Sequence, residues 1–381
     1  MGHFDASILK SVLAPVESAR GLPNELYIDQ DAFLAEKKAV FQRNWAGIGF
    51  AKDIAERGDA LPITFLGIPL LAVRGQDDQV RVFQNTCRHR GMILLEEKTR
   101  LHRVIRCPYH SWCYSLEGAL KKTPHVGGSG CDSHEAVRKE DLGLIEIRSV
   151  VYRDVIFVNL SGDAPSFEEQ AGSLIGRWRE FDQPLFHAGP DSSFKLEVNC
   201  NWKLAVENYC ESYHLPFVHP GLNSYSRLED HYHIEEPGHY AGQGTLVYSP
   251  TLDEGGRRFP DFEGLDRKWD KAAEYVAFFP NVLFGVHRDH AYAILLEPVS
   301  QTRTVEHVEL YYATQDACYG DLADLRARNS TLWKGIFVED VGVVEGMQKG
   351  RYGEKFDGGK FSPVMDRPTH CFHQWVASQF V

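Results

Sequence analysis

Long hydrophobic runs and an excess of positive charge are both missing from this sequence. No stretch approaches the roughly eighteen consecutive apolar residues of a membrane-spanning helix. The net charge is −12, with 41 basic and 53 acidic residues, which disfavours nucleic acid or an anionic membrane as a partner because both select basic surfaces. Residues 1–5 also lack the basic segment that begins a secretory signal. We therefore expect a cytoplasmic protein that binds neither nucleic acid nor a membrane.

Motifs for binding flavin or nicotinamide cofactors are missing as well. No G-x-G-x-x-G follows a predicted strand, and the C-x4-C-x2-C spacing of plant-type ferredoxins does not occur. The eight cysteines do not form the pattern of a small disulfide-bonded domain, which favours a reducing compartment. At 381 residues, 43% of them hydrophobic, the chain is long enough for two domains. Any redox reaction of this chain would need a separate reductase.

Two short pairs of cysteine and histidine occur in the first third of the chain. C-R-H at 87–89 and C-P-Y-H at 107–110 are separated by seventeen residues. A Rieske [2Fe–2S] cluster takes two thiolates on its inner iron and two imidazoles on its outer iron, and the two pairs supply that set. A tetrahedral zinc site is the alternative, although zinc motifs usually pair Cys with Cys and His with His. The predicted cluster ligands are Cys87, His89, Cys107 and His110.

Hydrophobic periodicity predicts an α+β fold with two domains. Apolar positions in 29–45 have helical spacing, and the residues that follow form short β-like runs between turn signals. We predict a small antiparallel β domain over 45–160 that holds the cluster. Residues 1–44 and 161–381 form the second domain, an antiparallel sheet covered by helices. The predicted strands include 60–65, 69–73, 80–84, 103–106, 150–160, 194–199, 275–279, 282–286, 291–297 and 305–313, and further helices are predicted at 167–181 and 321–346.

A polar stripe lies in the second domain. Asn208, Glu211 and His214 recur every three residues, and a predicted helix over 201–214 would place them on one face. Such a face needs solvent or a buried partner. Pro216 would end this helix and allow the chain to turn back.

The stripe contributes to a second candidate metal site. Two imidazoles and one carboxylate form the facial triad of non-haem Fe(II) oxygenases. His214 and His219 would supply the imidazoles, because the chain turns back between them. Asp340 is the best candidate carboxylate, since it lies in an otherwise apolar helical segment where an unpaired charge is costly. The alternatives are a structural, hydrogen-bonded histidine at 214 and a surface charge at 340 beside Glu339.

Taken together, these motifs resemble those of a known family. The two Cys-His loops and the segments 207–219 and 339–348 resemble the Rieske-type non-haem iron oxygenases, the ring-hydroxylating α subunits. Respiratory Rieske proteins carry an extra cysteine in each loop, where this sequence has Met92 and Tyr109. The resemblance implies a Rieske [2Fe–2S] cluster, mononuclear Fe(II) bound by the triad and O2 as co-substrate. It also implies a catalytic domain of the helix-grip type, a homotrimer, and an NAD(P)H-dependent reductase of flavin or ferredoxin type as electron donor.

In that family an acidic residue bridges the cluster of one subunit and the mononuclear iron of the next, and by position this residue is Glu211. The predicted catalytic residues are Glu211, as this bridge, and Asn208, from the same polar stripe. Ring dioxygenases use Asp as the bridge and have one more residue after the equivalent of Glu207. The compact Glu-Asn-Tyr-x-Glu-x-Tyr-His found here instead resembles the carnitine and glycine betaine monooxygenases.

Resemblance to this branch implies hydroxylation or N-demethylation of a small quaternary ammonium compound. An aromatic cage suits such a cation. Candidate walls of the cage are Tyr209, Phe278, Phe279 and Phe284. One alternative is mono- or dioxygenation of an aromatic acid or ring, for which Arg288 could bind a carboxylate. A more distant alternative is an electron-transfer protein without oxygenase activity.

Overall fold

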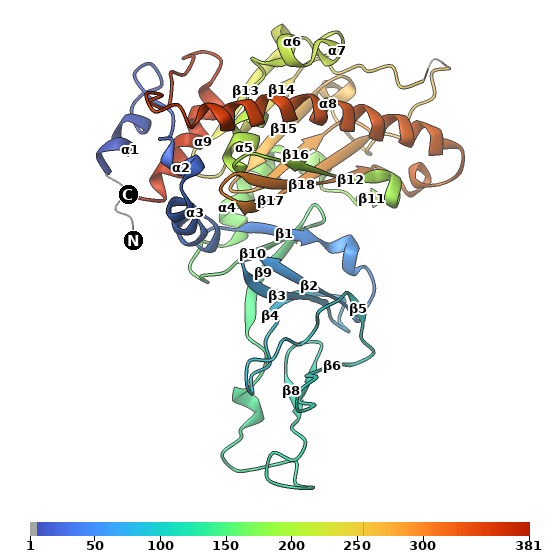
Figure 1. The fold of residues 1–381 in the computed structure, drawn as a ribbon. Helices are drawn as coiled ribbons and strands as arrows, with labels where there is room; N and C mark the ends of the chain where they lie inside the picture. The colour runs from blue at the N-terminus through green and yellow to red at the C-terminus, as the bar shows by residue number, and fades with distance from the viewer. Residues whose placement is uncertain (1–5, 254) are drawn as a thin grey trace. The chain divides into compact units, whose positions relative to one another are not determined.

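The chain divides into two compact units. The computed structural model describes residues 6–253 and 255–381 (Figure 1). One unit comprises Met1–Ala46 and Pro165–Val381, and the other comprises Gly47–Ala164. Residues 1–5, on which the expectation about a secretory signal depends, lie outside the described residues. Within the described ranges, every helix is too short or too polar to cross a membrane.

The smaller unit is built from antiparallel strands. One sheet has the order β1-β10-β9-β4-β3-β2-β5, and a three-stranded sheet has the order β6-β7-β8. Buried apolar side chains of both sheets pack in one cluster with Cys87 and Cys107, so the cysteines belong to the core of this unit. The strands span Ala46–Phe50 (β1), Asp59–Phe65 (β2), Ile68–Arg74 (β3), Val80–Gln84 (β4), Thr99–Arg100 (β5), Val104–Arg106 (β6), Cys113–Ser115 (β7), Leu120–Lys122 (β8), Glu146–Tyr152 (β9) and Val155–Asn159 (β10).

The hairpin β9–β10 corrects the single strand predicted over 150–160. Arg153 and Asp154 form its two-residue turn, and both have positive φ, 48° and 68°. Left-handed geometry at both central positions is that of a type I′ turn, which Asn-Gly or Asp-Gly sequences usually mark. The sequence Arg-Asp carries no such mark, so the pattern of apolar residues concealed the turn.

The larger unit is built on one antiparallel sheet and several helices. Its order is β11-β18-β17-β16-β15-β14-β13, and β12 also pairs with β18. The strands span Phe186–His187 (β11), Ser193–Val198 (β12), His231–Glu236 (β13), Tyr240–Thr245 (β14), Ala273–Phe278 (β15), Val282–Val286 (β16), His290–Ser300 (β17) and Arg303–Tyr312 (β18). The helices span Ala6–Val12 (α1), Glu25–Ile28 (α2), Gln30–Glu36 (α3), Phe167–Arg177 (α4), Trp202–Cys210 (α5), Leu215–Val218 (α6), Pro220–Asn223 (α7), Ala323–Gly350 (α8) and Arg367–Ser378 (α9).

Helices α5 and α8 lie against this sheet (Figure 1). α5 contacts β14, β15 and β17, while α8 contacts α5 and β12. The α+β class and the helix-covered antiparallel sheet predicted from the sequence are therefore confirmed. Gly335 does not interrupt α8, which spans 28 residues. The helix predicted over 29–45 begins as α3, whose N-cap Asp29 accepts hydrogen bonds from two backbone N–H groups, and continues as a π-helix over Lys37–Gln42.

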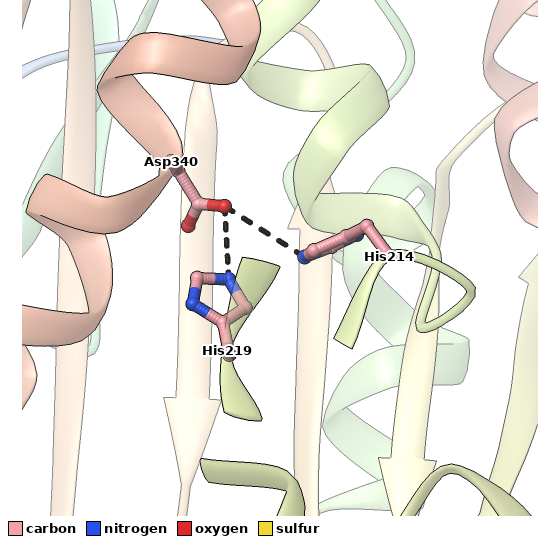
Figure 2. Close-up of side chains that lie close together, drawn as sticks. All are labelled: His214, His219 and Asp340. Carbon is pink, nitrogen blue, oxygen red and sulfur yellow. Dashed lines mark ion pairs between the residues drawn. The ribbon is translucent and has the colours of Figure 1, made fainter. Parts of the chain in front are cut away.

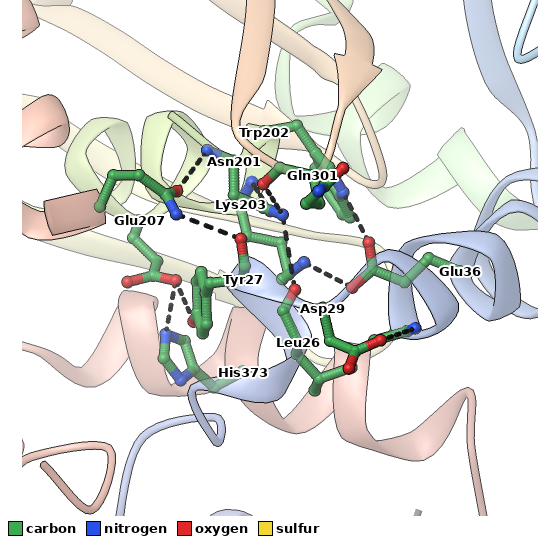
Figure 3. Close-up of polar contacts among 12 residues, drawn as sticks. Leu26, Tyr27, Asp29, Glu36, Asn201, Trp202, Lys203, Glu207, Gln301 and His373 are labelled. Carbon is green, nitrogen blue, oxygen red and sulfur yellow. Dashed lines mark hydrogen bonds and ion pairs between the residues drawn. The ribbon is translucent and has the colours of Figure 1, made fainter. Parts of the chain in front are cut away.

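A buried polar network joins the N-terminal helices to the start of α5 (Figure 3). Glu36 and Lys203 form an ion pair with both side chains fully buried, and Trp202 Nε1 donates to Glu36 Oε2 at 3.1 Å. Burial raises the pKa of Glu36 and lowers that of Lys203, while their pairing opposes both shifts. The pair therefore fixes α3 against α5 only as long as both charges are present.

A second part of the network holds the other end of α5. The Tyr27 hydroxyl donates to Glu207 Oε1, and His373 Nε2 lies 3.2 Å from the same oxygen (Figure 3). His373 Nδ1 accepts from Leu22 N at 3.0 Å, which places the imidazole proton on Nε2, facing Glu207. Contacts from α2 and α9 thus fix the last turn of α5, directly before the residues of the candidate site.

We expect Lys203→Met to lower the free energy of unfolding by about 3–5 kcal/mol, because it leaves the buried Glu36 carboxyl without its counter-charge. The double variant E36L/K203M should recover most of this loss, since two apolar side chains avoid the desolvation penalty of both ions. Urea unfolding followed by circular dichroism measures both variants. A double variant no more stable than the single one would contradict this account of the pair.

Candidate functional site

The two Cys-His pairs lie in loops with the same backbone hydrogen bonds. The N–H groups of Cys87 and Cys107 each donate, at 2.8 Å, to the carbonyl five residues later. Gly91 N and Ser111 N then donate to the carbonyls of the two cysteines, each at 3.1 Å. Gly91 and Ser111 have φ values of 75° and 57°, the left-handed conformation that such tight reversals need. The two loops therefore have equivalent backbone hydrogen bonds, and each presents one cysteine and one histidine.

These side chains converge in a way that fits a Rieske cluster. The rings of His89 and His110 have centroids 4.6 Å apart, and His89 stacks on Trp112 at 4.8 Å. Within the described part of the chain, no hydrogen-bond partner reaches the buried Nδ1 of His110. Burial raises the pKa of the Cys107 thiol, and the N–H groups of Tyr109 and His110 oppose this shift by donating to its sulfur. Two thiols and two imidazoles that come together in this way, with the Tyr114 hydroxyl 3.2 Å from the Cys87 sulfur, suit an iron–sulfur cluster.

The helix predicted over 201–214 is wrong in its last turn, because α5 ends before Glu211. Glu211 is extended (φ −124°, ψ 160°), and its carboxylate accepts hydrogen bonds from the N–H groups of Tyr213 and His214. These bonds replace those that a continuing helix would offer. Pro216 lies in the first turn of α6, where a missing N–H costs nothing, so it helps to begin α6 instead of ending α5.

The structure brings the three predicted triad residues together (Figure 2). His214 precedes α6, His219 lies between α6 and α7, and Asp340 lies on α8. Asp340 Oδ1 is 2.9 Å from His219 Nε2 and 3.7 Å from His214 Nε2. Among the described residues, no hydrogen bond of suitable geometry reaches this buried oxygen. The three ligand atoms lie within 4.8 Å of one another, an arrangement that suits a metal ion held by a facial triad.

The second nitrogen of each histidine contacts a glutamate. His214 Nδ1 lies 2.6 Å from Glu211 Oε1, and His219 Nδ1 lies 2.7 Å from Glu339 Oε2. A carboxylate partner holds the imidazole proton on Nδ1 and leaves Nε2 free to bind a metal. Glu339 appeared in the sequence only as a neighbouring charge. Its position next to Asp340 on one helix was the available signal of this role.

A cavity of about 60 Å³ lies beside the triad. Asn208, the other predicted catalytic residue, lines it, and among the described lining residues none is a lysine or an arginine. Tyr209 donates from its hydroxyl to the carbonyl of Phe284 at 2.9 Å, and its oxygen lies 3.0 Å from the Tyr292 hydroxyl. The aromatic residues that line the cavity are Tyr209, Tyr275, Tyr292, Trp333 and Phe337.

One cross-strand row of the sheet supplies much of this wall. In register, Gln243 pairs with Tyr275, Tyr275 with Gly285, and Gly285 with Tyr292. Residues in such a row face the same side of the sheet. A Cβ added to Gly285 would lie 2.3 Å from the ring of Tyr292, so glycine at this position makes room for that ring.

Three of the predicted cage residues lie outside this cavity. Phe278 and Phe284 are out of phase with the row of Tyr275 and Gly285, so they point to the opposite face of the sheet. Phe278 packs on Phe167 with ring centroids at 5.8 Å, Phe284 on Trp178 at 6.4 Å, and Phe279 on Trp375 at 4.9 Å. The prediction of these walls was wrong because it considered only that aromatic residues are present. It did not consider that successive side chains of a strand point to opposite faces of the sheet.

Arg288 does not line the triad cavity either. Its guanidinium donates from Nε to Asp261 Oδ1 at 2.8 Å and from Nη1 to the carbonyl of Asp270 at 3.1 Å. The side chain is therefore part of a surface ion pair and hydrogen bond, not a carboxylate receptor at the triad.

Two family models match the chain. The model described as "Ring hydroxylating alpha subunit (catalytic domain)" matches residues 187–380, and the model described as "Rieske [2Fe-2S] domain" matches residues 44–138. The matched ranges contain the triad and the Cys-His loops, respectively.

Individual proteins with known activities are also similar over the whole chain. The carnitine monooxygenase oxygenase subunit of Escherichia coli K12 is 26% identical over 388 aligned positions, which cover 99% of this chain and 98% of that protein. The glycine betaine monooxygenase oxygenase subunit of Pseudomonas aeruginosa is 24% identical and covers 94% of this chain and 89% of its own. The solved structure of the quaternary ammonium Rieske monooxygenase CntA with L-carnitine has a TM-score of 0.76 at 22% identity, covering 100% of both chains.

We expect His214→Ala to lose the mononuclear iron and to keep the visible absorption of the [2Fe–2S] cluster, because the two sets of ligands come from different units. Iron analysis and absorption spectroscopy of the purified variant measure the two separately. His307→Ala, which changes a half-buried histidine paired with Glu297, serves as the control. Loss of both signals in H214A alone would contradict two independent sites.

Proposed function

Since the chain belongs to the family of ring-hydroxylating α subunits, we propose that it is a terminal oxygenase that hydroxylates or N-demethylates a small quaternary ammonium compound. As a Rieske non-haem iron oxygenase, the protein is an oxidoreductase that uses a [2Fe–2S] cluster, a mononuclear iron and O2. Our proposal assigns the cluster to the domain 45–160 and the mononuclear iron to the domain formed by 1–44 and 161–381.

The side chains of the chain have distinct roles in this proposal. His214, His219 and Asp340 would hold the mononuclear iron, and Cys87, His89, Cys107 and His110 would hold the cluster. When bound, the metals supply the activation of O2 and the transfer of two electrons to it. Glu211 and Glu339 hold the Nδ1 protons of the two histidines and keep their Nε2 atoms directed at the metal. The aromatic wall excludes water and orients the substrate at the triad.

The main support for a quaternary ammonium substrate is that the cavity beside the triad has an aromatic wall and, among its described lining residues, no basic side chain. A trimethylammonium group loses hydration when it is buried, and the faces of Trp and Tyr rings replace part of that interaction. An anionic aromatic acid would need a lysine or arginine, and the described residues that line the cavity include neither. Relatives named for carnitine and glycine betaine oxidation support the quaternary ammonium group, and the carboxylates of these two compounds would need a partner outside this cavity.

The reaction then follows from the position of the substrate. Insertion of one oxygen atom into a C–H bond consumes O2, two electrons and two protons, and it releases one water. If the carbon is an N-methyl group, the product is an N-hydroxymethyl ammonium ion, which breaks its C–N bond to release formaldehyde, a proton and the demethylated tertiary amine. The electron donor in this proposal is an NAD(P)H-dependent reductase of flavin or ferredoxin type, and the compartment is the cytoplasm.

Ligand binding tests the substrate class directly. We expect choline, carnitine or glycine betaine to bind more tightly than 3,3-dimethylbutanol, the uncharged carbon analogue of choline, by about 5- to 30-fold, the equivalent of a cation–π term of roughly 1–2 kcal/mol. Calorimetry on the iron-loaded protein measures this ratio, and Trp333→Leu should reduce it. Formaldehyde release with a generic reductase identifies N-demethylation. Tighter binding and turnover of an aromatic acid would instead support the aromatic alternative.

We also propose a head-to-tail homotrimer in which Glu211 bridges two subunits. Tyr213 and Phe217, next to the triad, are 47% and 78% exposed and contact each other with ring centroids at 6.5 Å. In the smaller unit, Tyr109 is 55% exposed beside His110. Exposed aromatic side chains next to both metal sites support an interface between different surfaces of identical subunits, which closes into a ring.

Under this proposal, Glu211→Ala should keep the cluster and the mononuclear iron but slow the reoxidation of the reduced cluster by O2 and substrate at least 10-fold, because the route between subunits loses its hydrogen bonds. Stopped-flow absorption in a single turnover measures the rate. Glu229→Ala, a change of an exposed carboxylate, is the control. Reoxidation of E211A at the normal rate would rule out the bridge.

A further inference from the structure

A second cavity lies behind Asp340, between the sheet and helices α5 and α8. Its volume is about 30 Å³, and most of its wall consists of aliphatic side chains such as Leu283, Ile294 and Val344. Asn208 and Asp340 line this rear cavity as well as the cavity of the triad. The rear cavity therefore reaches the candidate metal ligand from the side away from the substrate.

One acidic side chain faces this apolar space. Glu306 lies on β18 between Leu196 of β12 and Leu296 of β17, on the face of the sheet that also carries Tyr292. Within the described residues, no hydrogen bond or ion pair reaches its carboxyl group. Within the same residues, the side-chain amide of Asn208 neither donates nor accepts a hydrogen bond. Both residues are partly buried, and their polar groups line the rear cavity, so a water molecule there can supply the missing partner.

The carboxyl of Glu306 is suited to donate a hydrogen bond. Burial raises its pKa to about 8, and the negative charge of Asp340 is the smaller cause. A metal bound to Asp340 would offset the negative charge of Asp340, but it would not change the burial of Glu306. Burial is the larger cause of the raised pKa of Glu306, so the neutral acid is still favoured. A neutral acid can donate to one acceptor and accept from another donor.

The rear cavity is of the right size for water and too small for an organic ligand. A buried water needs about 10–15 Å³ of such space and two to four polar partners, so 30 Å³ admits one or two molecules. Glu306, Asn208 and Asp340 provide three partners on different elements. Figure 2 shows dashed lines from one oxygen of Asp340 to both histidines and none from the other oxygen.

We propose that Glu306 is a positioning residue, which holds water in the rear cavity and through that water fixes Asn208 and the second oxygen of Asp340. The inference rests on the proposed role of Asp340 as a metal ligand. Outer partners of this kind orient a ligating carboxylate, and their loss typically weakens metal binding by about 10- to 100-fold. A carboxylate without an outer hydrogen bond can rotate about its Cβ–Cγ bond and present either oxygen.

The test compares two replacements of Glu306 of similar length. Glu306→Gln keeps a donor and an acceptor, and Glu306→Met keeps the volume but removes both. We expect E306M to raise the dissociation constant for Fe(II) of the apo protein about 10-fold, and to broaden the electron paramagnetic resonance signal of the Fe(II) protein treated with nitric oxide. E306Q should stay within about 2-fold of the unchanged protein. Glu297→Gln, on the opposite face of β17, is the matched control.

Each outcome decides the proposal. If E306M binds Fe(II) as tightly as the unchanged protein and gives the same signal, the proposed positioning role of Glu306 is wrong. The proposal is also wrong if E306Q is as defective as E306M, because the carboxylic acid itself, and not the water it holds, is then required. Failure of the unchanged protein to bind Fe(II) would instead overturn the proposed function. If E306M does not fold, a high-resolution crystal structure of the unchanged protein decides, since an empty rear cavity overturns the proposal and an ordered water on Glu306 and Asn208 supports it.

Discussion

The candidate active site depends on the way Glu211 interrupts a helix. Its carboxylate accepts hydrogen bonds from the N–H groups of Tyr213 and His214 and contacts the imidazole of His214. These contacts take the place of the backbone hydrogen bonds of a continuing helix and orient the ring of His214. One side chain therefore ends a helix, begins the next turn and orients a candidate metal ligand. The buried contacts of Glu207, one turn earlier, hold the helix that carries it.

Each unit builds its site from backbone turns that direct side chains inward. In the smaller unit, two loops with the same hydrogen bonds present one thiol and one imidazole each. In the larger unit, the two histidines flank the short helix α6 while the long helix α8 supplies Asp340 and Glu339 together. Because these two acidic residues are neighbours on one rigid helix, one contacts Nε2 of His219 and the other contacts Nδ1 of the same ring.

The sequence was informative where a function depends on local spacing. The Cys-His loops and the convergence of His214, His219 and Asp340 could be predicted, because few structures other than a metal site bring such residue types together at those intervals. The aromatic wall could not, since it depends on the register that aligns Tyr275, Gly285 and Tyr292 across three strands. The end of α5 was missed because the Glu211 side chain replaced backbone hydrogen bonds. The turn at Arg153 and Asp154 was missed because no glycine follows the aspartate to mark a two-residue turn.

Gly285 gives the sheet a gap that the ring of Tyr292 fills. The ring can lie flat against the strand only because no atom stands on the glycine. A residue with a side chain at this position would displace the ring of Tyr292, which lines the cavity beside the triad, without altering a metal ligand. The backbone at Gly285 thus helps to set the size of molecule that the cavity beside the triad admits. Related proteins can therefore differ in substrate range through this one position.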